Sequence, residues 1–259
     1  GNFQAAINFA MIMNSLSIPI SLTLLPAFSK LEDKREAIKE FFKRSVKYTS
    51  MAILPITILL LFYAEEIVQI IYSKGFELTS TFLSLYVIIY LFVGMGSNVL
   101  GSFFNGLRKT SINLKCTLVS SVTFIVLAPL LTWFLKVNGM IMAFVTSQLV
   151  GTFYGLYIAK KLFKVEIDIK MISRIYLVSL VSALPIFAMK VIPLYSNIVQ
   201  VMMGAAAYFA IYLLMIPVTK VITFTELKEI KRVLENIKPL KYLAKPILHY
   251  EEKIMLKIS

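Results

Sequence analysis

The chain has 259 residues, of which 58% are apolar and only 16% carry a charged side chain, and its mean hydropathy is +0.79. A water-soluble domain keeps about a quarter of its residues charged. The composition therefore excludes a soluble enzyme, a disordered chain and a disulfide scaffold, and it leaves a polytopic membrane protein. Cys116 is the single cysteine, so no disulfide within the chain is expected.

Seven apolar segments are long enough to cross a bilayer, which takes about 20 helical residues. In chain order they cover approximately residues 3–28, 46–63, 80–106, 112–135, 139–160, 171–192 and 197–219. Charged side chains occur only near the ends of these segments, where long side chains reach the interface. The sequence therefore predicts an all-α polytopic transmembrane helix bundle with seven spans.

Lys and Arg are sorted between alternate connections of the predicted bundle. All but three of the 27 fall on one side, and the exceptions are Lys74, Lys136 and Lys190. Because cytoplasmic loops accumulate Lys and Arg, we expect residue 1 outside and the carboxyl terminus in the cytoplasm. A nucleic-acid-binding protein would not sort its basic residues in this way, so no nucleic-acid partner is expected.

The amino end carries no signal peptide with a basic leading region before the first apolar segment. A first span that enters from outside therefore has nothing in this sequence to translocate its amino end. We expect further spans upstream, so that the chain is the carboxyl-terminal part of a longer membrane protein. The missing amino-terminal half of the same protein is then its first expected partner.

Proline lies inside five of the seven predicted spans, at Pro19, Pro55, Pro129, Pro185 and Pro217. An interior proline removes a helical hydrogen bond and kinks the helix. Membrane helices tolerate this because neighbouring groups satisfy the freed carbonyl. The kinks suit helices that bend during work, with the ordinary abundance of proline in membrane helices as the alternative.

A basic amphipathic stretch connects the first two predicted spans. Ser29 and Glu32 have the spacing of a capping box, which predicts a helix start. Apolar side chains then recur along one face up to Val46, with Lys and Arg on the others. We expect the connector 30–47 to lie along the inner headgroups.

The carboxyl-terminal segment repeats this pattern. Thr223 and Glu226 form a second candidate capping box, followed by an apolar stripe on a basic helix. We expect an amphipathic cytoplasmic tail at 224–259 that docks on the anionic inner leaflet. His249, the only histidine, has no second metal ligand nearby and is expected to be solvated.

Four amides are candidate substrate-path residues because they lie within or at the ends of predicted spans: Asn14, Asn98, Asn105 and Gln148. An amide in hydrocarbon must find a partner, since an unmet donor is costly. Two arrangements meet that requirement, namely hydrogen bonds between helices and a water-filled cavity that a polar ligand enters. The sequence leaves both open.

Small residues mark two expected helix contacts. Gly151 and Gly155 are four residues apart, and Gly204 precedes three alanines. Such patterns let membrane helices approach closely. The last two spans otherwise carry few polar groups, so we expect them to face lipid or a lipid tail.

No pattern for catalysis or metal binding occurs. All fourteen carboxylates lie in connections, the tail or span margins, and there is no nucleophile elbow or phosphate-binding loop. We therefore expect no catalytic residue, no metal, no cofactor and no enzyme activity. A relay for protons or sodium is not evident either, because no acid lies in mid-membrane.

Three stretches carry a resemblance to a known family. They are IPISLTLLPAFSKL ending at Leu31, IVQIIYSKGFELTSTFLSL at 67–85, and SFFNGLRKTSINLKCTLVSSV at 102–122 followed by VNGMIMAFVTSQLV at 137–150. In order and spacing they resemble the polysaccharide-biosynthesis flippases of the multidrug/oligosaccharidyl-lipid/polysaccharide exporter superfamily, over about residues 3–223. One departure is Gly75, which comes later in the external loop than in the usual pattern.

The resemblance implies a fourteen-helix transporter of which these spans are helices eight to fourteen. Residues 1–163 would form most of the second lobe, 164–223 an appended two-helix pair and 224–259 the cytoplasmic tail. It also implies alternating access and the translocation of a polyprenyl-linked saccharide across the cytoplasmic membrane. The implied partners are membrane lipids and the lipid-linked saccharide.

Arg108, Lys109 and Lys115 are candidates for binding the diphosphate headgroup of the lipid-linked saccharide, with a role as topology-setting charges as the alternative.

Two other functions remain to be weighed. A drug or metabolite cation antiporter of the same superfamily would need acidic sites inside the membrane, and none occurs in this chain. A seven-helix retinal receptor would need a lysine in the last span, which is absent.

Overall fold

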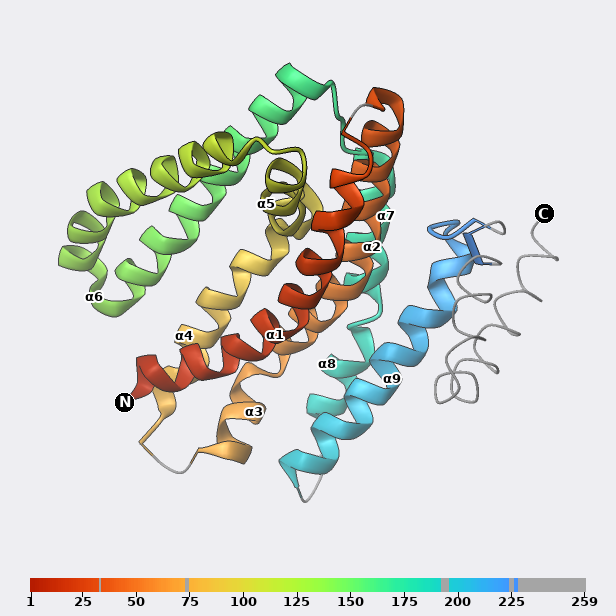
Figure 1. Ribbon diagram of the computed structural model, residues 1–259. Helices are drawn as coiled ribbons and strands as arrows, with labels where there is room; N and C mark the ends of the chain where they lie inside the picture. Colours follow the sequence, from red (N-terminus) through yellow and green to blue (C-terminus); the bar gives the residue numbers. More distant parts are fainter. Residues whose placement is uncertain (33, 73–74, 192–195, 224–225, 228–259) are drawn as a thin grey trace.

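The computed structural model describes residues 1–32, 34–72, 75–191, 196–223 and 226–227 (Figure 1). Every regular element in this part of the chain is a helix, so the predicted all-α class is confirmed. The elements are α1 (Asn2–Ser29), α2 (Arg35–Phe62), α3 (Ala64–Ile71), α4 (Glu77–Val87), the 3-10 helix η1 (Ile88–Met95), α5 (Ser97–Gly106), α6 (Thr110–Phe163), α7 (Ile169–Val181), α8 (Leu184–Val191) and α9 (Asn197–Val218).

Six helical segments of the described chain are long and apolar enough to cross a membrane, whereas we expected seven. The difference lies in α6, whose 54 residues contain both the fourth and the fifth predicted span. The backbone leaves helical geometry at Lys136 (φ 52°, ψ −130°), and Figure 1 shows the two arms of α6 folded back on each other. The turn is so short that both arms count as one helix. A Cβ on Gly139 would overlap the backbone of Leu131, so the turn requires a glycine there.

Two predicted spans are interrupted. The third is divided into α4, η1 and α5, and it changes direction at Gly96, which is left-handed (φ 80°). In Figure 1, α5 is seen close to end-on while α4 lies across the view. The sixth span is divided into α7 and α8 at Ser182 and Ala183, just before Pro185. Neither break followed from the apolar runs, because both segments are apolar throughout.

The predicted connector 30–47 does not form a helix separate from the second span. Residues 35–62 form one continuous helix, and the capping box expected at Ser29 does not start it, since α2 begins after Lys34 without a side-chain cap. The apolar face of this part of α2 packs against other helices of the bundle. Phe42 is fully buried, with its ring centroid 5.0 Å from that of Phe103 in α5. Arg35, Lys43 and Arg44 of this part of α2 remain exposed, whereas Lys47 is buried.

The bundle is arranged around α2. Helix α1 packs on α4 and α5, α2 packs on η1 and α7, and the arms of α6 lie against α4, η1 and α5. On the other side of α2, α8 packs on α9, and α9 also contacts α3 and α7. The α6 hairpin and the segment α7–α9 therefore lie on opposite sides of the bundle in Figure 1. We call α7, α8 and α9 the appended pair, after their two spans.

Proline occupies helix interiors as expected. Pro19 and Pro26 lie in α1, Pro55 in α2, Pro129 in α6 and Pro217 in α9. Pro55 cannot donate to the carbonyl of Met51, one helical turn earlier. The hydroxyl of Tyr212, in α9, donates to that carbonyl at 2.9 Å. The bond that α2 loses is thus replaced by one that ties α9 to α2.

Candidate functional site

A cavity of 520 Å³ lies between the two arms of α6 and the amino-terminal part of α5. Its wall is unusually polar for the interior of an apolar bundle. The polar lining comprises Ser97, Asn113, Thr117, Ser120, Ser121, Ser147, Gln148 and Thr152. The rest of the wall is formed by Leu100, Phe104, Cys116, Phe124, Ile125, Phe144 and three glycines, Gly101, Gly151 and Gly155. We call this space the polar cavity.

Small residues bring the two arms of α6 together at the polar cavity. A Cβ on Gly151 would overlap the hydroxyl of Ser120 on the opposite arm. A Cβ on Gly155 would lie 3.1 Å from Leu100 Cδ1 and 3.4 Å from Cys116 Sγ. The close packing predicted from the spacing of the two glycines is confirmed. It lets polar side chains of one arm face those of the other.

The cavity hydroxyls are satisfied as donors by their own helices. Thr117 donates to the carbonyl of Asn113 at 3.1 Å, Ser120 to that of Cys116 at 3.2 Å, and Thr152 to that of Gln148 at 2.8 Å. A hydroxyl that donates in this way keeps its lone pairs as acceptors. The cavity therefore presents hydrogen-bond acceptors without any unpaired hydroxyl donor among these three side chains.

Of the four predicted amides, Gln148 alone lines the polar cavity. Among the described residues its side-chain amide has no hydrogen-bond partner, so it is free to meet a ligand. The other three bond to protein. Asn14 accepts from the Tyr90 hydroxyl at 2.9 Å, Asn98 from Ser97 at 3.2 Å, and Asn105 from the side-chain amide of Asn113 at 3.3 Å.

Both arrangements that the sequence left open thus occur in this bundle. Asn113, Thr117 and Ser120 were missed as cavity residues. Their spacing of four and three residues places them on one face of the first arm, and that polar face was the signal that could have found them.

The three basic candidates lie outside the cavity wall. Arg108 precedes α6 in a left-handed conformation (φ 55°), and its Nε lies 3.3 Å from Glu32 Oε2. Lys109 and Lys115 are exposed at the same end of the first arm. The arm continues directly into the cavity residues, with Asn113 one turn after Lys109. The structure therefore places these cations at the start of the first arm of α6 and not in contact with Gln148.

A second polar feature ties the segment that follows α9 to α2. Lys47 forms an ion pair with Glu226 at 2.7 Å, with side chains only 9% and 13% exposed. Tyr48 also donates to Glu226 at 3.0 Å, and the backbone N–H of Thr223 does so at 2.8 Å. The N–H of Glu226 in turn approaches the Thr223 hydroxyl at 3.4 Å, so the second capping box is confirmed. The rest of the expected tail, apart from Leu227, lies outside the described residues.

The charge state of this tie is well defined. Burial alone would raise the pKa of Glu226, but hydrogen bonds from Lys47 and Thr223 outweigh it and lower that pKa to about 2. Beside it, Asp168 caps α7 by accepting from the N–H of Met171 at 2.9 Å and pairs with Lys43 at 3.0 Å. These contacts hold the pKa of Asp168 below its ordinary value. Both carboxylates are therefore ionised at neutral pH.

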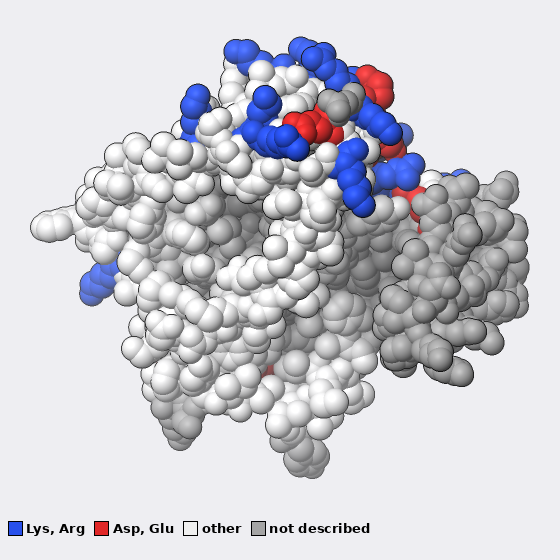
Figure 2. All heavy atoms as spheres, viewed as in Figure 1, with Lys and Arg blue, Asp and Glu red and all other residues white. Residues whose placement is uncertain are grey.

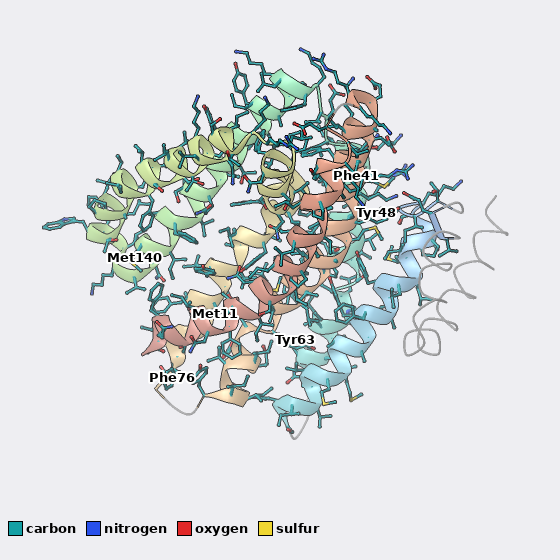
Figure 3. All side chains as sticks on the ribbon, viewed as in Figure 1. Met11, Phe41, Tyr48, Tyr63, Phe76 and Met140 are labelled. Carbon is teal, nitrogen blue, oxygen red and sulfur yellow. The ribbon has the colours of Figure 1, made fainter. Side chains whose placement is uncertain are left out.

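The opposite end of the appended pair is tied as well. Lys190 pairs with Glu66 of α3 at 2.7 Å, and the Glu66 side chain is only 13% exposed. Tyr63, labelled in Figure 3 where α2 meets α8 and α9, is fully buried and donates to the carbonyl of Gln200 at 3.3 Å. A Cβ on Gly204 would overlap the Tyr63 hydroxyl, which confirms the tight contact predicted at that glycine.

Among the described residues, no three His, Cys, Asp or Glu side chains lie together as a metal site. The ionisable groups instead form ties between helices, and the polar cavity is lined by hydroxyls and amides. What the architecture defines is a polytopic membrane bundle with an uncharged polar cavity on one side of its central helix.

Comparison with known proteins shows where else this fold occurs. The fold matches a solved structure described as the lipid II flippase MurJ in its inward closed conformation, with a TM-score of 0.71 and 19% sequence identity. The match covers 83% of this chain and 46% of that one, so the chain spans less than half the length of the flippase it resembles.

A family model matches the first part of the chain. Residues 1–81 match the model described as polysaccharide biosynthesis protein. No curated protein matches the chain by sequence. The match over residues 1–81 and the shared fold both support the resemblance drawn from the sequence.

Proposed function

We propose that the protein is a membrane flippase that translocates a polyprenyl-linked saccharide by alternating access, for the synthesis of a surface polysaccharide or glycoconjugate. The observation that carries the proposal is the polar cavity, which is uncharged and lies in a bundle with the fold of a lipid II flippase. Transport, and not catalysis, fits such a cavity, because its side chains offer hydrogen bonds and no nucleophile paired with a base.

The chemistry of the cavity suits the hydroxyls of a sugar. Thr117, Ser120 and Thr152 offer acceptor oxygens, and the Gln148 amide offers both donors and an acceptor. Sugar hydroxyls both donate and accept, so each can bond to this lining. The cavity volume of 520 Å³ is in the range of small-ligand sites, which is about 300–1,000 Å³.

The main alternative is a drug or metabolite cation antiporter. A cation in a membrane cavity needs a carboxylate to offset its lost hydration. No residue that lines the polar cavity carries a charge, which favours a neutral polar headgroup over a cation. The saccharide flippase is therefore the better-supported function for this half of the transporter.

We propose the orientation with residue 1 outside and the carboxyl terminus in the cytoplasm. Figure 2 shows Lys and Arg gathered at one end of the bundle, over the ends of α1, α2, α6 and α7. The six spanning segments make the protein a multi-pass membrane protein, and the basic end is the one expected at the cytoplasmic face. Residues 1–163 are then most of the second lobe and 164–223 the appended pair.

Arg108, Lys109 and Lys115 are proposed to meet the diphosphate of the substrate at the cytoplasmic end. Arg108 is 80% exposed on its side chain, and its contact with Glu32 at 3.3 Å leaves most of its donors in water. Arg108 and Lys109 lie about one turn before Asn113, the first lining residue of this arm, and Lys115 lies between Asn113 and Thr117. A diphosphate held there would place its sugar toward Asn113 and Thr117.

A matched pair of threonines on one helix tests the site. Thr117 lines the polar cavity and Thr123 does not, yet both hydroxyls donate to the carbonyl four residues earlier. We expect Thr117→Val and Gln148→Leu to lower flipping several-fold, and Thr123→Val to leave it unchanged. The measurement is the amount of lipid-linked saccharide that accumulates on the inner leaflet of cells carrying each variant.

The proposal also predicts the result of losing the whole protein. Cells without it should accumulate lipid-linked saccharide on the inner leaflet. Unchanged export of the saccharide in such cells would reject the flippase, whereas equal flipping by the two threonine variants would reject the cavity as its path.

A further inference from the structure

A second cavity, of 670 Å³, separates the second arm of α6 from α7. Its floor is formed by Phe42 of α2, Met95 of η1 and Ile172 of α7, and its walls include Phe153 and Leu156 of α6. The lining is apolar except at one end. We call this space the α6–α7 groove.

The α6–α7 groove lies on a different face of α6 from the polar cavity. Phe153, Leu156 and Lys160 recur at intervals of three and four residues and face the groove, whereas Gln148, Thr152 and other residues face the polar cavity. One arm of α6 therefore separates a polar space from an apolar one. Whatever fills the groove supports the wall of the polar cavity from behind.

The groove is held open by the backbone. The side chain of Tyr176 extends from α7 to the 3-10 helix η1, where its hydroxyl donates to the carbonyl of Leu91. Gly94 lies under this tyrosine, where a Cβ would come within 2.7 Å of the ring. Helix α6 then ends at Lys164 in a left-handed conformation (φ 56°), and the following segment leads to α7. Helices α6 and α7 consequently make little direct contact.

The mouth of the groove combines an apolar side with a basic end. Phe153 and Ile169 are 52% and 78% exposed, so hydrocarbon reaches the groove from the side. Lys160 lines the groove at its end, Lys161 is next to it in the last turn of α6, and Lys164 is the residue that follows the helix. The single acid there is Glu166, which is 3.8 Å from Lys160 in a pair exposed by more than 70% on both sides, and such a pair is weak. The end of the groove thus carries excess positive charge.

We propose that the α6–α7 groove binds an anionic phospholipid of the inner leaflet, with one acyl chain in the groove and its phosphate at Lys161 and Lys164. In the orientation proposed above, the basic end lies at the cytoplasmic headgroups, where anionic lipids are concentrated. Basic pockets between membrane helices on that side bind anionic headgroups. The acyl chain fills the apolar space that η1 and Tyr176 keep open, and it braces the arm of α6 that lines the polar cavity. This goes beyond the flippase function, since the lipid is a bound component and not the cargo.

Photolabelling tests the site directly. The purified protein is placed in nanodiscs with a phosphatidylglycerol that carries a diazirine on one acyl chain, and the labelled peptides are mapped by mass spectrometry. We expect label on Phe153, Leu156 and Ile169, reduced at least tenfold by excess unlabelled phosphatidylglycerol and not by phosphatidylcholine.

Charge variants separate headgroup binding from nonspecific attraction. Lys161→Gln with Lys164→Gln should reduce labelling of the groove, by about fivefold for each lysine. Lys30→Gln with Lys34→Gln removes the same charge from exposed lysines outside the groove and should leave the label unchanged. Leu156→Trp, which fills the groove, should abolish the label, and Ser173→Trp provides the same test from the α7 wall if the first variant does not fold.

The contrary results are equally specific. Equal labelling in the Lys161/Lys164 variant and its control would overturn the headgroup assignment. Competition by phosphatidylcholine as effective as that by phosphatidylglycerol would do the same. Displacement of the label by a polyprenyl phosphate, but not by phosphatidylglycerol, would show that the groove holds the tail of a substrate instead.

Discussion

The α6 hairpin and the appended pair are both apolar two-span units, yet they are attached to the bundle in different ways. In α6, 6% of the residues in the most apolar window are buried, against 39% in the α7–α8 segment and 28% in α9. The hairpin contacts the bundle through Gly155, which lies against Leu100, and through two aromatic pairs, Tyr86–Phe144 and Phe103–Phe163. The pair is tied by an ion pair and Tyr63 at one end and by Tyr212 farther along α9, and the segment just after α9 adds the buried ion pair of Glu226 with Lys47.

This difference shows what holds helices together in a membrane. Lipid tails are as apolar as leucine, so apolar burial does not by itself favour one helix contact over another. Close packing and polar ties decide which helices behave as one unit. We therefore interpret the appended pair as a fixed wall attached to α2, and the α6 hairpin as the more compliant side next to the polar cavity.

The largest effect is expected from removing the buried carboxylate of the ion pair between Lys47 and Glu226. Glu226→Ala leaves Lys47 charged and buried without its partner, which costs about 3 kcal/mol of unfolding free energy in typical cases. The measurement is unfolding in mixed detergent micelles. As a control, Glu40→Ala removes an exposed carboxylate of α2 that pairs with Arg44 and should change stability by less than about 1 kcal/mol. Equal effects of the two variants would show that the tie is not structural.

Overpacking the contact between α9 and Tyr63 should have the next largest effect. The new methyl group of Gly204→Ala would overlap the Tyr63 hydroxyl, and we expect a loss of about 2 kcal/mol. Gly101→Ala is the matched control, since the nearest atom to its Cβ would be 3.9 Å away. Adding Tyr63→Phe to Gly204→Ala removes the closest contact and should restore part of the loss. An unaltered or larger loss in the double variant would contradict the packing explanation.

The hydrogen bond from the Tyr212 hydroxyl to the Met51 carbonyl should contribute about 1 kcal/mol to the free energy of unfolding. Tyr212→Phe removes the donor to the Met51 carbonyl and leaves the buried packing of the ring in place. In a Pro55→Ala background residue 55 regains its N–H and satisfies that carbonyl within α2. The cost of Tyr212→Phe should therefore be smaller in that background. A double-mutant cycle that gave the same cost in both backgrounds would refute the link.

The smallest effect is the pH dependence of the ion pair between Lys47 and Glu226. The pKa of Glu226 is about 2 in the folded protein and 4.5 for the ordinary side chain, so its stabilisation is present above about pH 4.5 and is lost as the pH falls toward 2. Between pH 7 and pH 4 we expect a loss of less than about 1 kcal/mol. Glu226→Gln should lack this component in the same unfolding series. Parallel curves for the two proteins would show that the pKa of this group is not lowered by folding.

Much of the site could be anticipated from local patterns, and part could not. The close contacts at Gly151 and Gly204 and the capping box at Thr223 follow from spacings of three or four residues, which a helix converts directly into neighbours. Gln148 was likewise an expected cavity amide. Asn14 and Asn105 were expected in the same role but bond to protein, because the positions of Tyr90 and Asn113 relative to them depend on how α4, η1 and α6 pack.

The apolar runs and the sorting of Lys and Arg determined that this chain is a multi-span helical bundle, because a bilayer admits few other backbones and each span needs a set length. Three sequence stretches in order also carried the family resemblance that the match over residues 1–81 supports. Only the tertiary structure decided that residues 35–47 are part of α2, that the third span bends at Gly96, and that Lys47 meets Glu226 far along the chain. Those outcomes depend on whether an apolar or charged face packs against another helix or faces lipid or water. Local sequence does not specify this, because the packing partners lie far away along the chain.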